Sequence, residues 1–264
     1  MSHLSVTNIS AGYGRHNIIE NISFDLDGGT LLGILGANGS GKTPLLKALC
    51  GILPHRGTCE LDATVLEKVS PKQLARLVSY IPQRSGISID ISALDVVLMG
   101  FNPQLGLLEH PTRQMEHAAM QALAQVGLSG REETNYLHLS EGQKQLCILA
   151  RTLVSDSRLL LLDEPESALD FRFRYQMLSL LRSWTASGER SAIVTLHDPA
   201  LALNYCDKLL LLCDGGVLDI IEPGFDSLDK MEQLLRIIYG PVSLQRCLNR
   251  NGKAQIVMLR EDEV

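Results

Sequence analysis

The sequence predicts an α/β protein in which helices cover a largely parallel β-sheet. Three observations support this fold class. The apolar run Thr30–Leu35 leads directly into glycines and then into the helix-like segment Pro44–Cys50, which is the βα unit of a parallel sheet. Two more short apolar runs, Leu159–Leu162 and Ser191–Leu196, have the length of buried strands, and a helical pattern follows each of them.

The N-terminal segment is predicted to form short strands. Leu4–Ile9 and Ile22–Leu26 show partial alternation of apolar and polar residues. The turn-forming residues Ala11–Gly14 follow the first strand, and Asp27–Gly29 follow the second. We therefore expect a small β-structure ahead of the strand Thr30–Leu35.

The middle of the chain is predicted to be mostly helical. The stretch from about Ile91 to Gly130 has helix-like periodicity, which is clearest at Arg113–Val126, where apolar residues recur at intervals of three and four. The expected elements are a helix at Pro71–Leu77, a strand at Val78–Pro82, and helices at Arg113–Val126 and Glu141–Val154.

The last third continues the alternation of helix and strand. The expected helices are Arg172–Ser187, Pro199–Tyr205 and Asp229–Ile238. Leu209–Cys213 and Val217–Ile221 flank Asp214–Gly216, which is typical of a hairpin. The tail is expected to end in two strands joined by Asn249–Gly252.

Composition excludes several classes of protein. The chain has 264 residues, of which 45% are hydrophobic and 20% charged, as in ordinary globular proteins, and this argues against disorder. A net charge of −6 gives no electrostatic footprint for nucleic acid. No apolar run is long enough to cross a bilayer, and we expect no signal peptide. The six cysteines show no metal-binding spacing, so we expect reduced, mostly packing thiols.

A glycine-rich loop follows the strand Thr30–Leu35 and fits the pattern G-x-x-x-x-G-K-[ST]. Its residues are Gly36, Ala37, Asn38, Gly39, Ser40, Gly41, Lys42 and Thr43. Such a loop lets backbone N–H groups and the start of a helix surround a phosphate, with Lys42 reaching the β- and γ-phosphates and Thr43 ligating Mg²⁺. Pro44 comes next and lacks an amide that commonly helps to hold the α-phosphate, so nucleotide affinity is expected to be somewhat lower.

Two carboxylates end the strand Leu159–Leu162. Asp163 is expected to enter the Mg²⁺ shell, and Glu164 to polarise an attacking water. Together with the phosphate loop they predict an enzyme that binds ATP with Mg²⁺ and hydrolyses it.

With these motifs the sequence resembles the ATP-binding-cassette (ABC) ATPases. Leu139–Gln143 precedes the strand Leu159–Leu162 and is similar to the family signature, with Glu141 in place of the commoner glycine. The resemblance implies that two chains pair head to tail. The residues that would cap the partner's ATP are Ser140, Glu141, Gly142 and Gln143.

Four further positions match the family in order. By resemblance, Tyr13 would stack on adenine, Gln83 would sense Mg²⁺ and the attacking water, and His197 would contact the γ-phosphate. Asp170 closes Ser167–Asp170, which is similar to the loop that crosses the dimer interface, with Glu166 where threonine is frequent. The implied catalytic residues are Glu164, His197 and Gln83, and the implied metal ligands are Thr43, Gln83 and Asp163.

The resemblance covers nearly the whole chain and implies a single ABC ATPase domain, 1–264. It implies a RecA-like core, an N-terminal antiparallel β subdomain, an inserted helical subdomain at approximately 88–150 and a tail at approximately 222–264.

One stretch, Ala93–Gly100, is similar to ATPases of importers for ferric siderophores, haem and cobalamin. That likeness implies integral membrane permease subunits, an indirect link to a substrate-binding protein, a homodimer or a paired ATPase subunit, and a place at the cytoplasmic face of the cell membrane. Two alternatives remain open at the level of sequence: a soluble ABC ATPase without a membrane partner, and a nucleotide-binding module that does not hydrolyse ATP.

Overall fold

The computed structural model describes residues 3–14, 16–83, 86–106 and 108–261. The chain divides into two compact units. The core unit consists of Met1–Glu67 and Leu181–Val264, and the inserted unit consists of Lys68–Leu180.

An antiparallel sheet opens the core unit, with strand order β2-β1-β4-β5. Its strands are β1 (Leu4–Tyr13), β2 (His16–Leu26), β4 (His55–Leu61) and β5 (Thr64–Val65). The predicted strands were too short, and the predicted turn at Ala11–Gly14 is wrong because β1 continues to Tyr13. Asn8 adopts φ 54° and the pairing shifts register on either side of Ile9, so the alternation of polar and apolar residues is interrupted within one strand.

The parallel strands of the core unit confirm the predicted βα organisation. β3 (Leu31–Gly36) lies between β8 (Ser191–Thr195) and β9 (Lys208–Cys213) and is parallel to both. β10 (Gly216–Ile221) pairs antiparallel with β9 through the predicted hairpin. Every residue of β3 and β8 is buried, as expected for strands covered on both faces.

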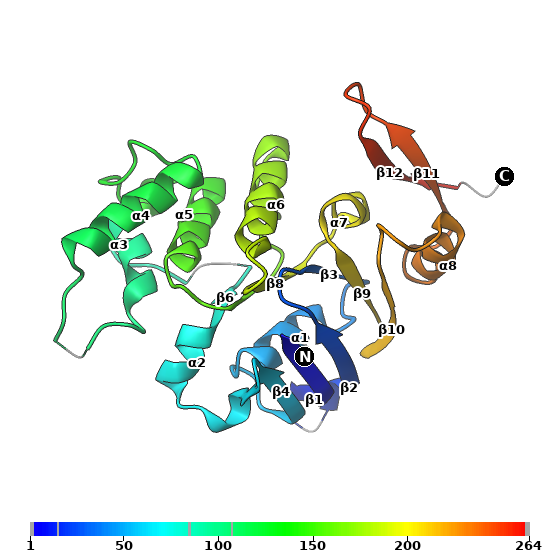
Figure 1. Cartoon of the computed structure of the whole chain (residues 1–264), viewed down its shortest axis with the longest axis horizontal. Coiled ribbons are helices and arrows are strands. Elements are labelled where there is room, and N and C mark those ends of the chain that lie inside the picture. Colours follow the sequence, from blue (N-terminus) through cyan, green and yellow to red (C-terminus); the bar gives the residue numbers. More distant parts are fainter. Residues whose placement is uncertain (1–2, 15, 84–85, 107, 262–264) are drawn as a thin grey trace. The chain divides into compact units, whose positions relative to one another are not determined.

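The C-terminal tail packs on the core unit through α7 (Pro199–Tyr205) and α8 (Leu228–Tyr239) (Figure 1). It ends in the predicted hairpin, β11 (Val242–Leu248) and β12 (Ala254–Arg260). The side chain of Asn204 in α7 makes two hydrogen bonds with the backbone of Ile256, one as donor and one as acceptor. Its Nδ2 donates to the Ile256 carbonyl at 2.8 Å, and its Oδ1 accepts from the Ile256 amide at 2.9 Å.

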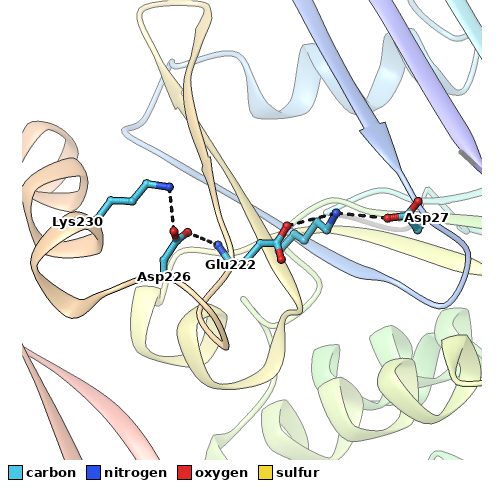
Figure 2. A network of polar contacts seen from close by, with 5 residues as sticks. Asp27, Glu222, Asp226 and Lys230 are labelled. Atoms are coloured by element: carbon cyan, nitrogen blue, oxygen red, sulfur yellow. Dashed lines mark hydrogen bonds and ion pairs between the residues drawn. The ribbon is translucent and has the colours of Figure 1, made fainter.

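A chain of polar contacts joins the start of α8 to the start of β9 and to the turn before β3 (Figure 2). Lys208 Nζ lies 3.4 Å from both Asp27 Oδ2 and Glu222 Oε1. The Glu222 amide donates to Asp226 Oδ2 at 2.7 Å, and Lys230 Nζ lies 3.0 Å from Asp226 Oδ1. The Glu222 amide, and then Lys230, hold the pKa of the Asp226 carboxyl below its ordinary value.

The inserted unit contains a helical bundle and a pair of parallel strands. Its elements are α2 (Pro71–Leu77), β6 (Val78–Ile81), α3 (Ala93–Leu98), α4 (Arg113–Gln125), α5 (Glu141–Leu153), β7 (Leu159–Leu162) and the first part of α6 (Phe171–Thr185). Figure 1 shows α3, α4 and α5 packed against one another. Serine side chains cap α2, α3 and α5 in reciprocal capping boxes, which fixes where each helix begins.

None of the helices in the described parts of the chain is long and apolar enough to span a bilayer.

Candidate nucleotide site

The glycine-rich loop joins β3 to α1 (Lys42–Leu49) in the core unit. Gly39 and Gly41 adopt φ 84° and 102°, a backbone region that side chains disfavour. A Cβ at Gly36 would collide with the Ser40 side chain and the Leu212 carbonyl. The Ser40 amide donates to the Ala37 carbonyl at 3.1 Å, so the loop closes on itself as a tight turn.

Two polar side chains of this loop are buried. Lys42 is only 6% exposed, and its Nζ donates to the carbonyls of Gly36 at 2.8 Å and Ala37 at 3.2 Å. Ser40 is 5% exposed, and within the described structure its Oγ has no hydrogen-bond partner. A buried hydroxyl without a partner is costly, and a phosphate oxygen would satisfy it. The loop therefore fits the phosphate tail of a nucleotide.

The helix after the loop begins two residues earlier than predicted, at Lys42 instead of Pro44. Gly41 is its N-cap, and the amide of Leu45 makes the first helical bond, to the Gly41 carbonyl at 2.9 Å. Pro44 thus lies in the first turn, where amides have no partner inside the helix, and its missing N–H costs the helix nothing.

Two more predicted residues lie in the core unit. Tyr13 ends β1 and is 54% exposed, so its ring is accessible to a flat ligand. His197 is exposed, two residues after the end of β8. The next residue is Asp198, whose Oδ1 accepts from the amides of Ala200 and Leu201 and so caps α7. This cap fixes the backbone beside His197.

The acidic pair lies at the end of β7 in the inserted unit. Asp163 is 2% exposed and accepts a hydrogen bond from the hydroxyl of Tyr80 at 3.2 Å. Gln83 Nε2 donates to Glu164 Oε2 at 2.6 Å, so the structure brings the predicted sensor and the predicted base together. Glu164 adopts φ 48°, an uncommon conformation for a residue with a side chain, and such strain concentrates at functional positions.

The signature segment lies at the start of α5. Ser140 is the N-cap: its Oγ accepts from the Gln143 amide at 3.3 Å, and its own amide donates to Gln143 Oε1 at 3.0 Å. Glu141 is exposed and forms an ion pair with Lys144 at 2.8 Å, which offsets the negative charge at this unusual position. A hydroxyl that accepts from a backbone amide still has its own proton to donate to a ligand.

The segment Ser167–Asp170 lies beside the signature within the same unit. A Cβ at Gly142 would approach the Ala168 carbonyl to 3.0 Å, which leaves room only for glycine without adjustment. Asp170 Oδ1 accepts from the Phe173 amide at 3.1 Å and caps α6. The signature segment is therefore fixed at the start of α5, and Ser167–Asp170 at the start of α6.

Tyr80 is the residue near the acidic pair to which the sequence assigns no role. It stands three positions before Gln83, and no spacing rule gives its hydroxyl a function. Only the parallel pairing of β6 with β7 reveals that the Tyr80 hydroxyl reaches Asp163.

Comparison with known proteins places these features in context. The model of the family described as ABC transporter matches residues 19–167. The ABC transporter ATP-binding protein YvrA of Bacillus subtilis is 34% identical over 209 residues, which are 78% of this chain and 47% of that protein, so the match spans about half of its length. The hemin import ATP-binding protein HmuV of Deinococcus radiodurans is 34% identical, covering 93% of this chain and 94% of its own.

A solved structure of an inward-facing ABC transporter, described as of the metal-chelate type, has 29% sequence identity and a TM-score of 0.82. The match covers 99% of both chains. The fold predicted from the sequence is thereby confirmed.

Proposed function

The chain belongs to the ABC transporter family, as an ATP-hydrolysing subunit, and from this premise we propose that it drives an importer of metal chelates. The relative from Deinococcus radiodurans is named for hemin import and aligns over nearly its whole length, which supports this class of cargo. The solved relative of metal-chelate type supports it independently. The proposed cargo is a ferric siderophore, haem or cobalamin.

The core unit supplies the groups that hold ATP. The loop from Gly36 to Pro44 surrounds the phosphates, Lys42 neutralises the β- and γ-phosphates, and the exposed ring of Tyr13 stacks on the adenine. His197 contacts the γ-phosphate. The buried Ser40 hydroxyl without a partner is the structural fact that supports this assignment most directly.

The metal ligands in this proposal are Thr43, Asp163 and Gln83. Hydroxyl, carboxylate and amide oxygens are the donors that Mg²⁺ prefers, so the set fits the ion. When bound, Mg²⁺ neutralises charge that develops on the phosphates. Glu164 orients and deprotonates the attacking water, and its contact with Gln83 at 2.6 Å is the observation that carries the hydrolytic mechanism.

A second ATPase subunit completes the site in this proposal. Ser140–Gln143 of one chain cap the nucleotide held by the other, and Asp170 lies at the interface between them. Nucleotide binding closes the pair, and hydrolysis opens it. The pair drives integral membrane permease subunits from the cytoplasmic face of the membrane, and a substrate-binding protein delivers the cargo to those subunits.

The replacement Glu164→Gln tests the mechanism. Glutamine keeps an acceptor for the Gln83 amide but cannot take a proton, so we expect ATP turnover to fall by at least about 100-fold. Binding of Mg²⁺ and ATP should persist, and light scattering should detect a stable ATP-bound dimer.

The control for this test is Glu189→Gln, which removes an exposed carboxylate in the core unit. That variant should hydrolyse ATP like the original protein. Full activity in Glu164→Gln would reject Glu164 as the base. Cargo class is tested separately, by purifying the chain with its permease and measuring haem and ferric siderophore uptake into vesicles.

A further inference from the structure

Two neighbouring carboxylates at the end of β7 each receive a hydrogen bond from the side of β6. Gln83, just beyond β6, donates to Glu164, whereas Tyr80, within β6, donates to Asp163. The family mechanism accounts for the first contact. The contact between Tyr80 and Asp163 involves the carboxylate that is proposed to bind the metal. The family mechanism does not explain what this contact does to that carboxylate.

The strand pairing explains why this tyrosine reaches this aspartate. β6 and β7 are parallel, with Tyr80 opposite Leu161, and the Asp163 amide continues the ladder by donating to the Ile81 carbonyl at 2.9 Å. Leu161 and Asp163 are two residues apart, so their side chains lie on the same face as Tyr80. A long aromatic side chain reaches such a diagonal neighbour.

The contact constrains the Asp163 carboxylate. The aspartate side chain is 2% exposed, and rotation about its last bond decides which way each oxygen points. A hydroxyl bound to Oδ2 fixes that rotation and therefore the direction of Oδ1. Outer hydrogen bonds of this kind orient metal ligands in many proteins.

We propose that Tyr80 is a positioning residue for Mg²⁺: its hydroxyl holds Asp163 Oδ2 so that Oδ1 faces the metal. The inference rests on the proposed function, since it takes Asp163 as a metal ligand. Tyr80 is not itself a ligand in this scheme, and it acts only through Asp163.

The replacement Tyr80→Phe removes the hydroxyl and keeps the ring. The measurement is ATP binding by calorimetry, with Mg²⁺ titrated from zero and with EDTA as the metal-free reference. We expect the Mg²⁺ concentration for half-maximal enhancement of ATP binding to rise about tenfold, as for other losses of an outer hydrogen bond. Metal-free ATP affinity should stay unchanged, because the phosphate loop is intact.

A double replacement separates positioning from a general loss of structure. In the Asp163→Asn background, Tyr80→Phe should have no further effect on the Mg²⁺ dependence. Tyr239→Phe removes a hydroxyl from α8 in the core unit and should leave both affinities unchanged.

Each result has a defined meaning. An unchanged Mg²⁺ dependence in Tyr80→Phe overturns the role of Tyr80, and so does an equal loss of affinity with and without the metal. If the original protein shows no Mg²⁺-dependent binding of ATP, the proposed function itself falls, and the role of Tyr80 falls with it.

Discussion

The side chain of Ser40 is the residue-scale support for the proposed phosphate site. Its hydroxyl is buried in the glycine-rich loop, and the described residues offer it no hydrogen-bond partner. Ser155, by contrast, is equally buried but bonds to Ser79, to Ser157 and to the Thr152 carbonyl. The fold satisfies the hydroxyl of Ser155, whereas in the proposed function a phosphate satisfies that of Ser40.

The replacement Ser40→Ala should therefore separate stability from binding. Without nucleotide, the free energy of unfolding should rise by up to about 1 kcal/mol, because an unsatisfied buried polar atom is removed. ATP affinity should fall about tenfold through loss of a charge-assisted hydrogen bond. Urea denaturation and calorimetry measure the two effects.

Ser155→Ala is the matched comparison, and it should lose about 1–2 kcal/mol of stability, because its partners are left unpaired. Destabilisation of the same size in Ser40→Ala would show that the Ser40 hydroxyl has a structural partner.

At the residue scale, the sequence predicts which side chains carry the chemistry better than it predicts which side chains contact one another. The loop around Lys42 and the pair Asp163 and Glu164 follow from residue types at fixed spacing after apolar strands. The contact between Tyr80 and Asp163 depends on the pairing of two strands far apart in the chain, and local sequence does not encode that register. The roles of Tyr13, Gln83, Ser140 and His197 remain predictions that rest on the family.

The bounds of two helices were predicted more accurately than the strands of the N-terminal antiparallel sheet, for a physical reason. α2 and α7 match their predicted bounds because a capping residue and a proline mark each start, at Ser70-Pro71 and Asp198-Pro199. β4 has no such marker: its sequence is polar, and Gly57 adopts φ 95° within it. Pairing with β1, and not its own pattern of side chains, makes this segment a strand.

The side chain of Asn204 is one of the contacts that attach the C-terminal hairpin, together with the side chains of Glu232 and Arg236 on α8. Asn204→Ala would leave the amide and carbonyl of Ile256 without their partner, at a cost of about 1–2 kcal/mol. We expect faster hydrogen exchange at the Ile256 amide and earlier proteolysis of the hairpin, with ATP binding unchanged.

Asn251→Ala, in the exposed turn of the same hairpin, is the control and should leave exchange at Ile256 as it was. Equal protection of Ile256 in Asn204→Ala would mean that other contacts hold the hairpin.

At the scale of the whole molecule, the predicted α/β class is confirmed, and the predicted packing role fits Cys59, Cys147 and Cys206, which are buried. Cys247 is exposed, so the expectation does not extend to it. Burial, and then the charge of Glu67, raises the pKa of Cys59 from 9.0 to about 12. Burial also raises the pKa of Cys147 to about 12, against a smaller opposing effect of Arg151.

These thiols predict a loss of stability in alkali. Well below pH 9 both thiols are neutral in the folded and unfolded states, so their contribution to stability is fully present. Between about pH 9 and 12 only the unfolded chain ionises, and each thiol lowers the free energy of unfolding by about 1.4 kcal/mol per pH unit. Urea denaturation at about pH 8 and about pH 10.5 measures this slope.

Replacing Cys59 and Cys147 together by alanine should make the dependence shallower, although Tyr239, whose pKa burial also raises to about 12, retains part of it. Cys247→Ala, which removes an exposed thiol, is the matched control variant. An identical slope in the double variant would contradict the assignment to the two buried thiols.

The turn between β11 and β12 closes on itself: the Asn249 amide donates to the Lys253 carbonyl, and the Gly252 amide donates to the Asn249 carbonyl. Residues 250–253 are exposed, and none of them is a candidate site residue of the core unit or of the inserted unit. Exposed loop tips of this kind tolerate insertions. An affinity tag or a fluorescent reporter inserted at this tip would leave the candidate site residues and the hydrogen bonds between Asn204 and Ile256 undisturbed. The protein could then be purified and imaged through an internal tag.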